Sequence, residues 1–189
     1  VWNGKKKTCI FISGQGSNLK NLISHSRGYN FPIKISLVIC NNREAIGLNY
    51  AKIYGIPYFL INTKLKNYEN KVLQTLKKYK ITFICLAGYM KIISKILTKN
   101  YPKKIINIHP SLLPKFKGLN TFSRILKNKE KETGCTVHYI NDKLDSGNKI
   151  VQKKFFITSK DDEKVLKIKT QKLEYKAFPE AIIKIFRDN

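Results

Sequence analysis

The sequence predicts an α/β fold in which a mostly parallel, twisted sheet carries helices on both faces. Short continuous apolar runs, such as residues 8–13 and 81–86, are typical of strands buried on both sides. Segments with helical apolar spacing separate these runs, and such an alternation of strand and helix is typical of parallel sheets. From residue 135 onward apolar and polar residues alternate more than in the earlier strands, which indicates an antiparallel C-terminal part.

The expected elements follow from these patterns and from the residues that interrupt them. Buried strands are expected at 8–13, 33–40, 56–61, 81–86 and 104–109, and mixed or antiparallel strands at 135–140 and 150–157. Helices are expected from residue 19 onward and at 44–54, 65–79, 92–97 and 121–127. The segment 159–162 fits a capping box for a final helical region, which Pro179 is expected to interrupt.

Length and composition indicate one soluble domain spanning residues 1–189. Hydrophobic residues make up 42% of the chain, enough for a core, and the chain contains no repeats or low-complexity linker. No apolar stretch reaches the roughly 18 residues of a membrane span. The apolar run 9–12 after Lys5–Lys7 is too short for a secretory signal, so we expect a cytoplasmic protein.

The four cysteines are far apart in the sequence, and each lies within an expected strand: Cys9, Cys40, Cys85 and Cys135. None forms a C-x-x-C pair, and the spacing of His, Cys and carboxylates matches no metal site. We therefore expect reduced, buried thiols and no metal.

The net charge of +25 raises the question of nucleic-acid binding. Only four of the 37 basic residues are Arg, whereas base readers rely on the bidentate Arg fork. Lys is abundant everywhere, which indicates a diffuse charge that can still steer anionic substrates. A basic RNA-binding module is the alternative, but it would need exposed aromatics, and most aromatics here fall within apolar runs. We expect no specific nucleic acid and no membrane as partners.

Three polar clusters follow buried strands, at the edge where open parallel sheets bind ligands. These clusters are Gly14–Asn18, Gly88–Lys91, and the pair Asn107 and His109. Because they come from distant parts of the sequence and are expected at one rim, they predict a binding site there.

The Gly14–Asn18 turn leads from a strand into a helix. Its glycines permit close backbone approach, and the N–H groups of the helix N-terminus attract an anion. The turn lacks the third glycine of a dinucleotide fingerprint and the Lys of a Walker loop, which favours a site for one phosphate. An ordinary turn capped by Ser17 or Asn18 is the alternative, and this segment alone does not separate the two.

Asn107 and His109 alternate along a strand and therefore share one face. Polar side chains on a buried strand are costly unless they are satisfied or used, so a pair of satisfied core groups is the alternative to a site. Asp142 and Asp145 lie in the segment 141–147, which is either a polar loop joining two strands or brings a carboxylate near His109, where it would raise the imidazole pKa. His138 is expected in the core or supporting the site, and His25 on the surface.

Together these segments resemble the folate-dependent formyltransferase family over nearly the whole chain. The resemblance rests on residues 12–19, 86–92, 107–114, 134–138 and 145–147, which occur in the family's order and spacing. It implies a Rossmann-like architecture and transfer of a formyl group from 10-formyltetrahydrofolate, as co-substrate, through a tetrahedral intermediate. The glycine loop resembles that of members whose acceptor is the amine of glycinamide ribonucleotide, a step of purine synthesis. The segment 107–114 is shared with members that formylate methionyl-tRNA, which is the alternative activity.

The resemblance also implies roles for individual residues. The catalytic residues would be Asn107, His109 and Asp145. The ribonucleotide and its phosphate would be held by Gly16, Ser17, Asn18, Gln171 and Glu174. Folate would be lined by backbone groups of Met90, Lys91, Ile92 and Ile93, and by Asn107. The enzyme would be a monomer or a homodimer. The chain departs from the family pattern at Lys91, which replaces an Arg, and at 118–122, which replaces a His-rich loop.

Overall fold

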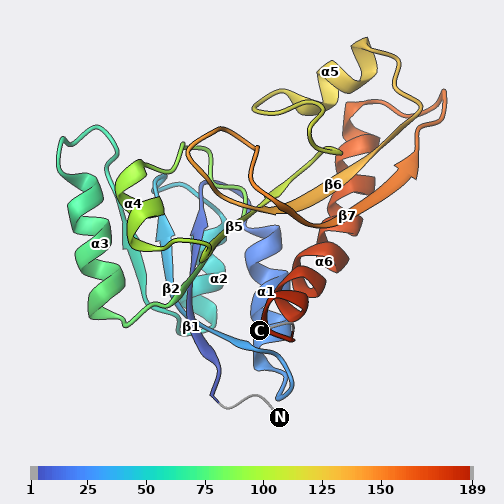
Figure 1. Ribbon diagram of the computed structural model, residues 1–189. Helices are drawn as coiled ribbons and strands as arrows, with labels where there is room; N and C mark the ends of the chain where they lie inside the picture. Colours follow the sequence, from blue (N-terminus) through green and yellow to red (C-terminus); the bar gives the residue numbers. More distant parts are fainter. Residues whose placement is uncertain (1–3, 188–189) are drawn as a thin grey trace. The chain divides into compact units, whose positions relative to one another are not determined.

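A computed structural model describes residues 4–187 and confirms the alternation of strands and helices (Figure 1). The strands are β1 (Lys6–Ile12), β2 (Ile33–Cys40), β3 (Tyr58–Leu60), β4 (Phe83–Leu86), β5 (Ile105–His109), β6 (Glu132–Tyr139) and β7 (Lys149–Phe156). The helices are α1 (Ser17–Arg27), α2 (Gly47–Ile53), α3 (Tyr68–Lys78), α4 (Lys95–Asn100), α5 (Thr121–Lys127) and α6 (Glu163–Arg187). None of the helices in this described range is long and apolar enough to cross a membrane.

The chain forms two compact units, and the division falls within β5, after Ile106. In the first unit the strand order is β3-β2-β1-β4, and every pairing between these strands is parallel. All but the outermost strand are apolar runs with almost every residue buried toward their carboxyl ends, because helices cover both faces of a parallel sheet. The predicted parallel sheet is confirmed. That residues 1–189 act as one domain remains a prediction.

Right-handed crossovers place the helices of the first unit on opposite faces of its sheet. The chain moves outward from β1 to β2 and β3, so α1 and α2 cover one face, and they pack on each other. It then returns past β1 to β4, so α3 and α4 cover the other face. The order therefore reverses between β1 and β4, which are adjacent strands.

The second unit contains the predicted antiparallel part. β6 and β7 pair antiparallel, with a register shift between Val137 and His138. The long helix α6 packs against both strands (Figure 1). Side chains of β6 alternate between two faces, so Cys135 and Val137 share one face, and Thr136 and His138 share the other.

The final helix differs from the prediction in two ways. Asp162, and not Ser159, caps its start, because the Asp162 carboxylate accepts a hydrogen bond of 2.7 Å from the Val165 N–H. Pro179 does not interrupt the helix, although an interior proline costs about 3 kcal/mol. Packing overrides this local preference, because Pro179 and its neighbours Ala177 and Phe178 are buried.

Three other helices begin later than predicted because polar side chains form turns before them. The Asn42 side chain accepts from the Glu44 N–H, which delays α2, and the Asn62 side chain accepts from the Lys64 N–H, which delays α3. Ser94 caps α4 by accepting from the Leu97 N–H, so this helix is shifted toward the C-terminus.

The hydroxyl of Thr136 is a buried junction that holds the loop after β5. It donates to the Ser111 carbonyl at 2.6 Å and accepts from the Leu113 N–H at 3.1 Å. It also accepts from the Gln152 side chain, which lies on β7, at 2.9 Å. Thr170, on α6, is equally buried, but its hydroxyl has no hydrogen-bond partner among residues 4–187.

These two threonines make a matched pair. We expect Thr136→Val to lower the free energy of unfolding by about 2–3 kcal/mol, because it leaves the Ser111 carbonyl and the Leu113 N–H without their buried partner. Thr170→Val should change it by less than about 0.5 kcal/mol or stabilise the protein, because it removes only an unsatisfied hydroxyl. Urea denaturation of both variants measures this difference, and equal losses would contradict the role given to Thr136.

Candidate active site

The order of the strands reverses between β1 and β4, which makes this place the switch point of the first unit's sheet. Parallel sheets bind ligands at such a switch point, outside the carboxyl ends of the strands. The loops after β1 and β4 are joined there, because the Met90 N–H donates to the Ser13 hydroxyl at 2.8 Å. Ser13 in turn donates to the Asn41 side chain, which follows β2, at 2.7 Å. Two of the three predicted polar clusters are therefore brought together by hydrogen bonds.

The glycine turn after β1 is shaped by contact with α2. Gly16 has a φ of 71°, a left-handed conformation that favours glycine, and immediately precedes α1. Gly47 donates to the Gly14 carbonyl at 3.0 Å, and a Cβ on Gly16 would overlap Gly47. A Cβ on Gly47 would lie 2.9 Å from the Gly16 Cα. The predicted phosphate loop thus depends on Gly47, which the sequence analysis did not single out.

Ser17 and Asn18 are the first two residues of α1, as an anion site at this helix N-terminus requires. No side chain caps the helix at Gly16. The alternative, in which Ser17 or Asn18 caps the helix, is therefore wrong.

The segment after β4 presents apolar side chains outward. Met90 is 62% exposed and Ile92 is 75% exposed, which is unusual for large apolar residues so close to a buried strand. Lys91 is also exposed, and Ile93 is half-buried. The segment is expected to offer backbone groups to folate, but the Met90 N–H is already used, because it donates to the Ser13 hydroxyl.

The three residues expected to be catalytic all lie in the second unit. Asn107 and His109 are on β5, and Asp145 is in the loop between β6 and β7. The Nδ1 atom of His109 lies 3.4 Å from the Asp145 carboxylate, and both side chains are 7% exposed. Asn107 contacts His138, whose Nε2 atom lies 3.6 Å from the other Asp145 oxygen. The predicted grouping is therefore present, with His138 as an additional member.

The sharp turn of the loop at residues 141–147 carries Asp145 to this position. Asn141 accepts hydrogen bonds from the Lys143 N–H and the Ser146 hydroxyl, which close the turn. A Cβ on Gly147 would overlap the Tyr139 carbonyl oxygen, so only glycine permits the loop to return this close to β6. Asp145 itself has a φ of 44°. Of the two carboxylates considered beside His109, Asp145 is buried and Asp142 is exposed.

Asp145 is held as a carboxylate. Burial alone would raise its pKa, but the His138 ring, the Gly118 N–H and the charge of His109 outweigh burial and lower the pKa to about 2. The Gly118 N–H donates to Asp145 at 2.9 Å, which ties the loop 116–120 to the carboxylate. This depressed pKa stabilises the folded state above the ordinary pKa of Asp, and the contribution is lost as the pH falls toward 2.

His109 experiences opposing effects. Burial lowers its pKa, whereas Asp145 and the Phe116 carbonyl, which lies 2.9 Å from Nε2, raise it. Burial outweighs them, so the pKa of His109 is below the ordinary value, and His138 and Arg124 add to the decrease. The predicted effect of Asp145 has the right sign, but the prediction of a net increase is wrong because it ignored desolvation.

Gln171 and Glu174 lie on α6, one turn apart and half-buried. Burial is the main cause that raises the pKa of the Cys135 thiol to about 12, and the negative charge of Glu174 is the second. Glu174 therefore lies near the Cys135 face of β6, whereas the trio contacts His138 on the opposite face. The role of these two residues in substrate binding stays a prediction.

All four thiols are free and buried, as predicted. Among the described residues, no three His, Cys, Asp or Glu side chains are grouped as metal ligands would be. His25 is exposed, as expected, although it lies within α1 and not after it.

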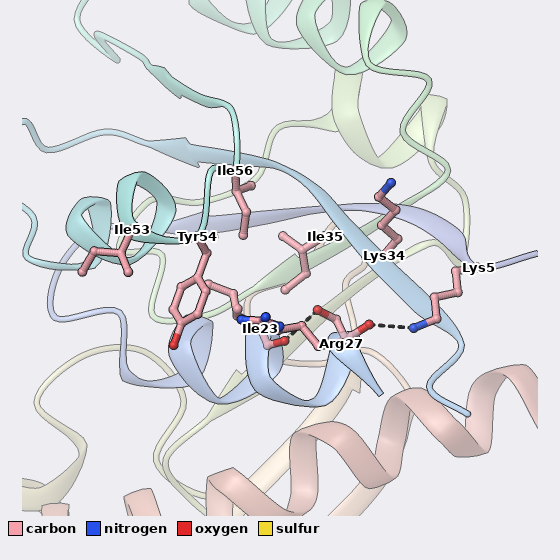
Figure 2. Close-up of a pocket in the computed structure, with 9 residues that line it drawn as sticks. Lys5, Ile23, Arg27, Lys34, Ile35, Ile53, Tyr54 and Ile56 are labelled. Atoms are coloured by element: carbon pink, nitrogen blue, oxygen red, sulfur yellow. Dashed lines mark hydrogen bonds between the residues drawn. The ribbon is translucent and has the colours of Figure 1, made fainter. Parts of the chain in front are cut away.

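A cavity of about 460 Å³ lies at the opposite end of the first unit's sheet (Figure 2). Its lining comes from the start of β1 and β2 and from the ends of α1 and α2. Lys5 is directed at the C-terminal end of α1, where it donates to the Ser26 and Gly28 carbonyls. The lining contains no His, Cys or carboxylate.

A buried imidazole–carboxylate pair beside an amide, on an α/β sheet with an anion-binding turn, defines an enzyme of group transfer. Residues 6–182 match the model of the formyl transferase family, and the chain belongs to this family.

Two bacterial relatives resemble the chain over most of their own length. A phosphoribosylglycinamide formyltransferase from Haemophilus influenzae is 38% identical over 187 residues, which cover 97% of this chain and 88% of the relative. One from Bacillus subtilis is 34% identical, over 94% of this chain and 93% of the relative. The crystal structure of phosphoribosylglycinamide formyltransferase from Anaplasma phagocytophilum has a TM-score of 0.92 at 36% identity, covering 98% of this chain and 88% of that one. The expected family and architecture are thus confirmed.

The opposing effects on His109 make a testable prediction. Asp145→Asn should lower the pKa of His109 further, because it removes the negative charge that stabilises the imidazolium. Asp142→Asn, in the same loop but exposed, should leave that pKa unchanged. An NMR titration of the His109 ring proton measures both variants, and a pKa that rises in Asp145→Asn would contradict the assigned pairing.

Proposed function

We propose that this chain transfers a formyl group from 10-formyltetrahydrofolate to the amine of glycinamide ribonucleotide, in purine synthesis. The observation that carries this proposal is the buried grouping of Asn107, His109 and Asp145 in a formyl transferase whose near full-length relatives are named for this activity. Both substrates are small molecules, and we further propose that the enzyme acts in the cytoplasm, as a monomer or homodimer, without a nucleic-acid partner.

The phosphate of the ribonucleotide would bind at the start of α1. Gly16, Ser17 and Asn18 place backbone N–H groups at a helix N-terminus, where the helix dipole favours an anion. The net charge of +25 would increase the rate at which such an anion reaches the site. Gln171 and Glu174 would contact the ribose and glycinamide portion.

The folate would lie along the segment from Met90 to Ile93 and bring the formyl group to Asn107. The exposed side chains of Met90 and Ile92 suit an apolar ring system, and burying them on binding is favourable. Lys91 is exposed and would serve the folate as a flexible point charge, without the bidentate geometry of the Arg common in this family. The co-substrate supplies the formyl group, and no metal is needed for the transfer.

Asn107, His109 and Asp145 would act on the formyl oxygen and on the proton of the attacking amine. Attack of the amine places negative charge on the former carbonyl oxygen, and the Asn107 amide and a His109 N–H are suited to donate to it. The Nε2 side of His109 faces the Phe116 carbonyl, a weaker acceptor than an oxyanion, so we propose that it exchanges one for the other.

The lowered pKa of His109 fits a ring that is neutral at rest and takes a proton transiently. At Nδ1, the nitrogen beside Asp145, it would take the proton that the attacking amine loses and return it to the folate nitrogen that leaves, while the Nε2–H stays on the oxyanion. Asp145, which stays ionised, would stabilise the imidazolium during this interval and keep the ring oriented.

A formyl-transfer assay with two acceptors tests the proposed activity. We expect transfer from 10-formyltetrahydrofolate to glycinamide ribonucleotide and none to methionyl-tRNA, because the relatives matched from end to end carry the ribonucleotide name. Transfer to the tRNA acceptor alone would overturn the proposal. Binding of a nucleic-acid duplex that weakens steeply with salt would overturn the diffuse-charge interpretation.

The same assay tests the assigned residues. Asn107→Ala, His109→Ala and Asp145→Ala should each lower kcat by about 100-fold or more and change KM little, because their contacts strengthen in the transition state. His25→Ala is the matched control and should keep the wild-type kcat, because His25 is exposed on α1. Normal turnover in His109→Ala would show that the proton transfer uses another group.

A further inference from the structure

His138 is a buried histidine for which the mechanism above has no use. It lies on β6, its side chain is 1% exposed, and its two ring nitrogens face different groups. Nδ1 lies 2.9 Å from the Tyr139 carbonyl oxygen, and Nε2 lies 3.3 Å from the Asn107 amide nitrogen. Because this imidazole is fully buried and contacts a residue of the proposed catalytic group, we expect it to affect the geometry of that group.

The Tyr139 carbonyl determines which ring nitrogen of a neutral His138 carries the proton. A carbonyl oxygen can only accept, so Nδ1 must donate, and the opposite tautomer would direct a lone pair at that oxygen. Nε2 of the neutral ring is then an acceptor. Gly147 preserves this arrangement, because any larger residue there would overlap the same carbonyl.

The acceptor at Nε2 determines in turn how the Asn107 amide is turned. Only the NH₂ end of the amide can donate to Nε2, so the amide nitrogen faces His138. One N–H is then used by His138, and the second N–H of the same group remains for the substrate. If the amide were reversed, its oxygen would face the Nε2 lone pair, and the site would lose its donor.

We propose that His138 is a positioning residue for formyl transfer: as the Nδ1–H tautomer fixed by the Tyr139 carbonyl, it turns the Asn107 amide so that an N–H meets the developing oxyanion. This inference rests on the proposed function. The competing arrangement is a ring protonated at Nε2 that donates to Asp145, a contact that also lowers the Asp145 pKa. The Asp145 oxygen lies 3.6 Å from Nε2, farther than the Asn107 nitrogen at 3.3 Å, which favours the Asn107 contact.

Two substitutions at His138 test which of its ring nitrogens is needed for activity. Gln reaches the position of Nε2 and its oxygen can accept from Asn107, whereas Asn reaches only the position of Nδ1. We expect His138→Gln to keep kcat within about 5-fold of wild type and His138→Asn to lower it about 30-fold or more, with KM for both substrates little changed. Equal losses in the two variants would overturn the proposal.

A double-mutant cycle distinguishes positioning from a merely structural role. In an Asn107→Ala background, His138→Asn should lower kcat by less than about 3-fold, because its effect passes through an amide that is no longer present. If the two losses multiply, His138 acts independently of Asn107 and the proposal fails.

The tautomer can be read directly in the wild-type protein. The ¹⁵N chemical shifts of His138 at pH 8 should show a protonated Nδ1 and an unprotonated Nε2, and a protonated Nε2 would overturn the proposal. This measurement uses the wild-type protein alone, so it depends neither on enzymatic turnover nor on the folding of a variant. A wild-type enzyme without transfer to glycinamide ribonucleotide would refute the proposed function, while the tautomer would still test the geometry.

Discussion

The buried carboxylate of Asp145 is the constraint on which the arrangement of the second unit depends. It lies between two imidazoles and accepts a backbone N–H from Gly118, so it links β5, β6 and the loop after β5. Removing a hydrogen-bond partner from a buried carboxylate leaves part of its charge unsatisfied, which typically costs about 1–3 kcal/mol or more. The same carboxylate thus stabilises the fold locally and keeps the chemical groups of the site in register.

Glycine at two positions allows these groups to approach. Gly47 permits α2 to contact the turn at Gly16, and Gly147 permits the loop of Asp145 to contact Tyr139. In each case a Cβ would overlap backbone atoms, which cannot move away as a side chain can. The glycine turn after β1 and the loop that carries Asp145 are therefore both defined by close contacts between backbone segments.

Electrostatics in this protein act at two distances. The excess of Lys over acidic residues produces a diffuse positive potential, which suits anionic substrates and falls off with added salt. At His109 the decisive effect is local, because desolvation lowers the pKa despite an adjacent carboxylate. Composition predicts the first effect, whereas the second requires knowledge of how completely the ring is buried.

The sequence by itself determined the elements and the chemistry available to them. Apolar runs and helical spacing predicted β2 and α5 at their observed bounds, and the motifs predicted Asn107, His109 and Asp145 as one group. Such features depend on local patterns, which a linear sequence records. The turn residues that delay α2 and α3 were misjudged, because side-chain hydrogen bonds such as those of Asn42 and Asn62 compete with helix formation.

Only the tertiary structure decided matters that depend on contacts between distant residues. The continuation of α6 through Pro179 follows from burial against β6 and β7, which outweighs local helix preference. The choice of Asp145 over Asp142, the net direction of the His109 pKa and the position of His138 beside Asn107 follow from packing. Motif spacing in the sequence identifies which side chains belong to the candidate site. Their protonation and orientation depend on burial and on the placement of hydrogen-bond donors and acceptors, and these exist only in the folded chain.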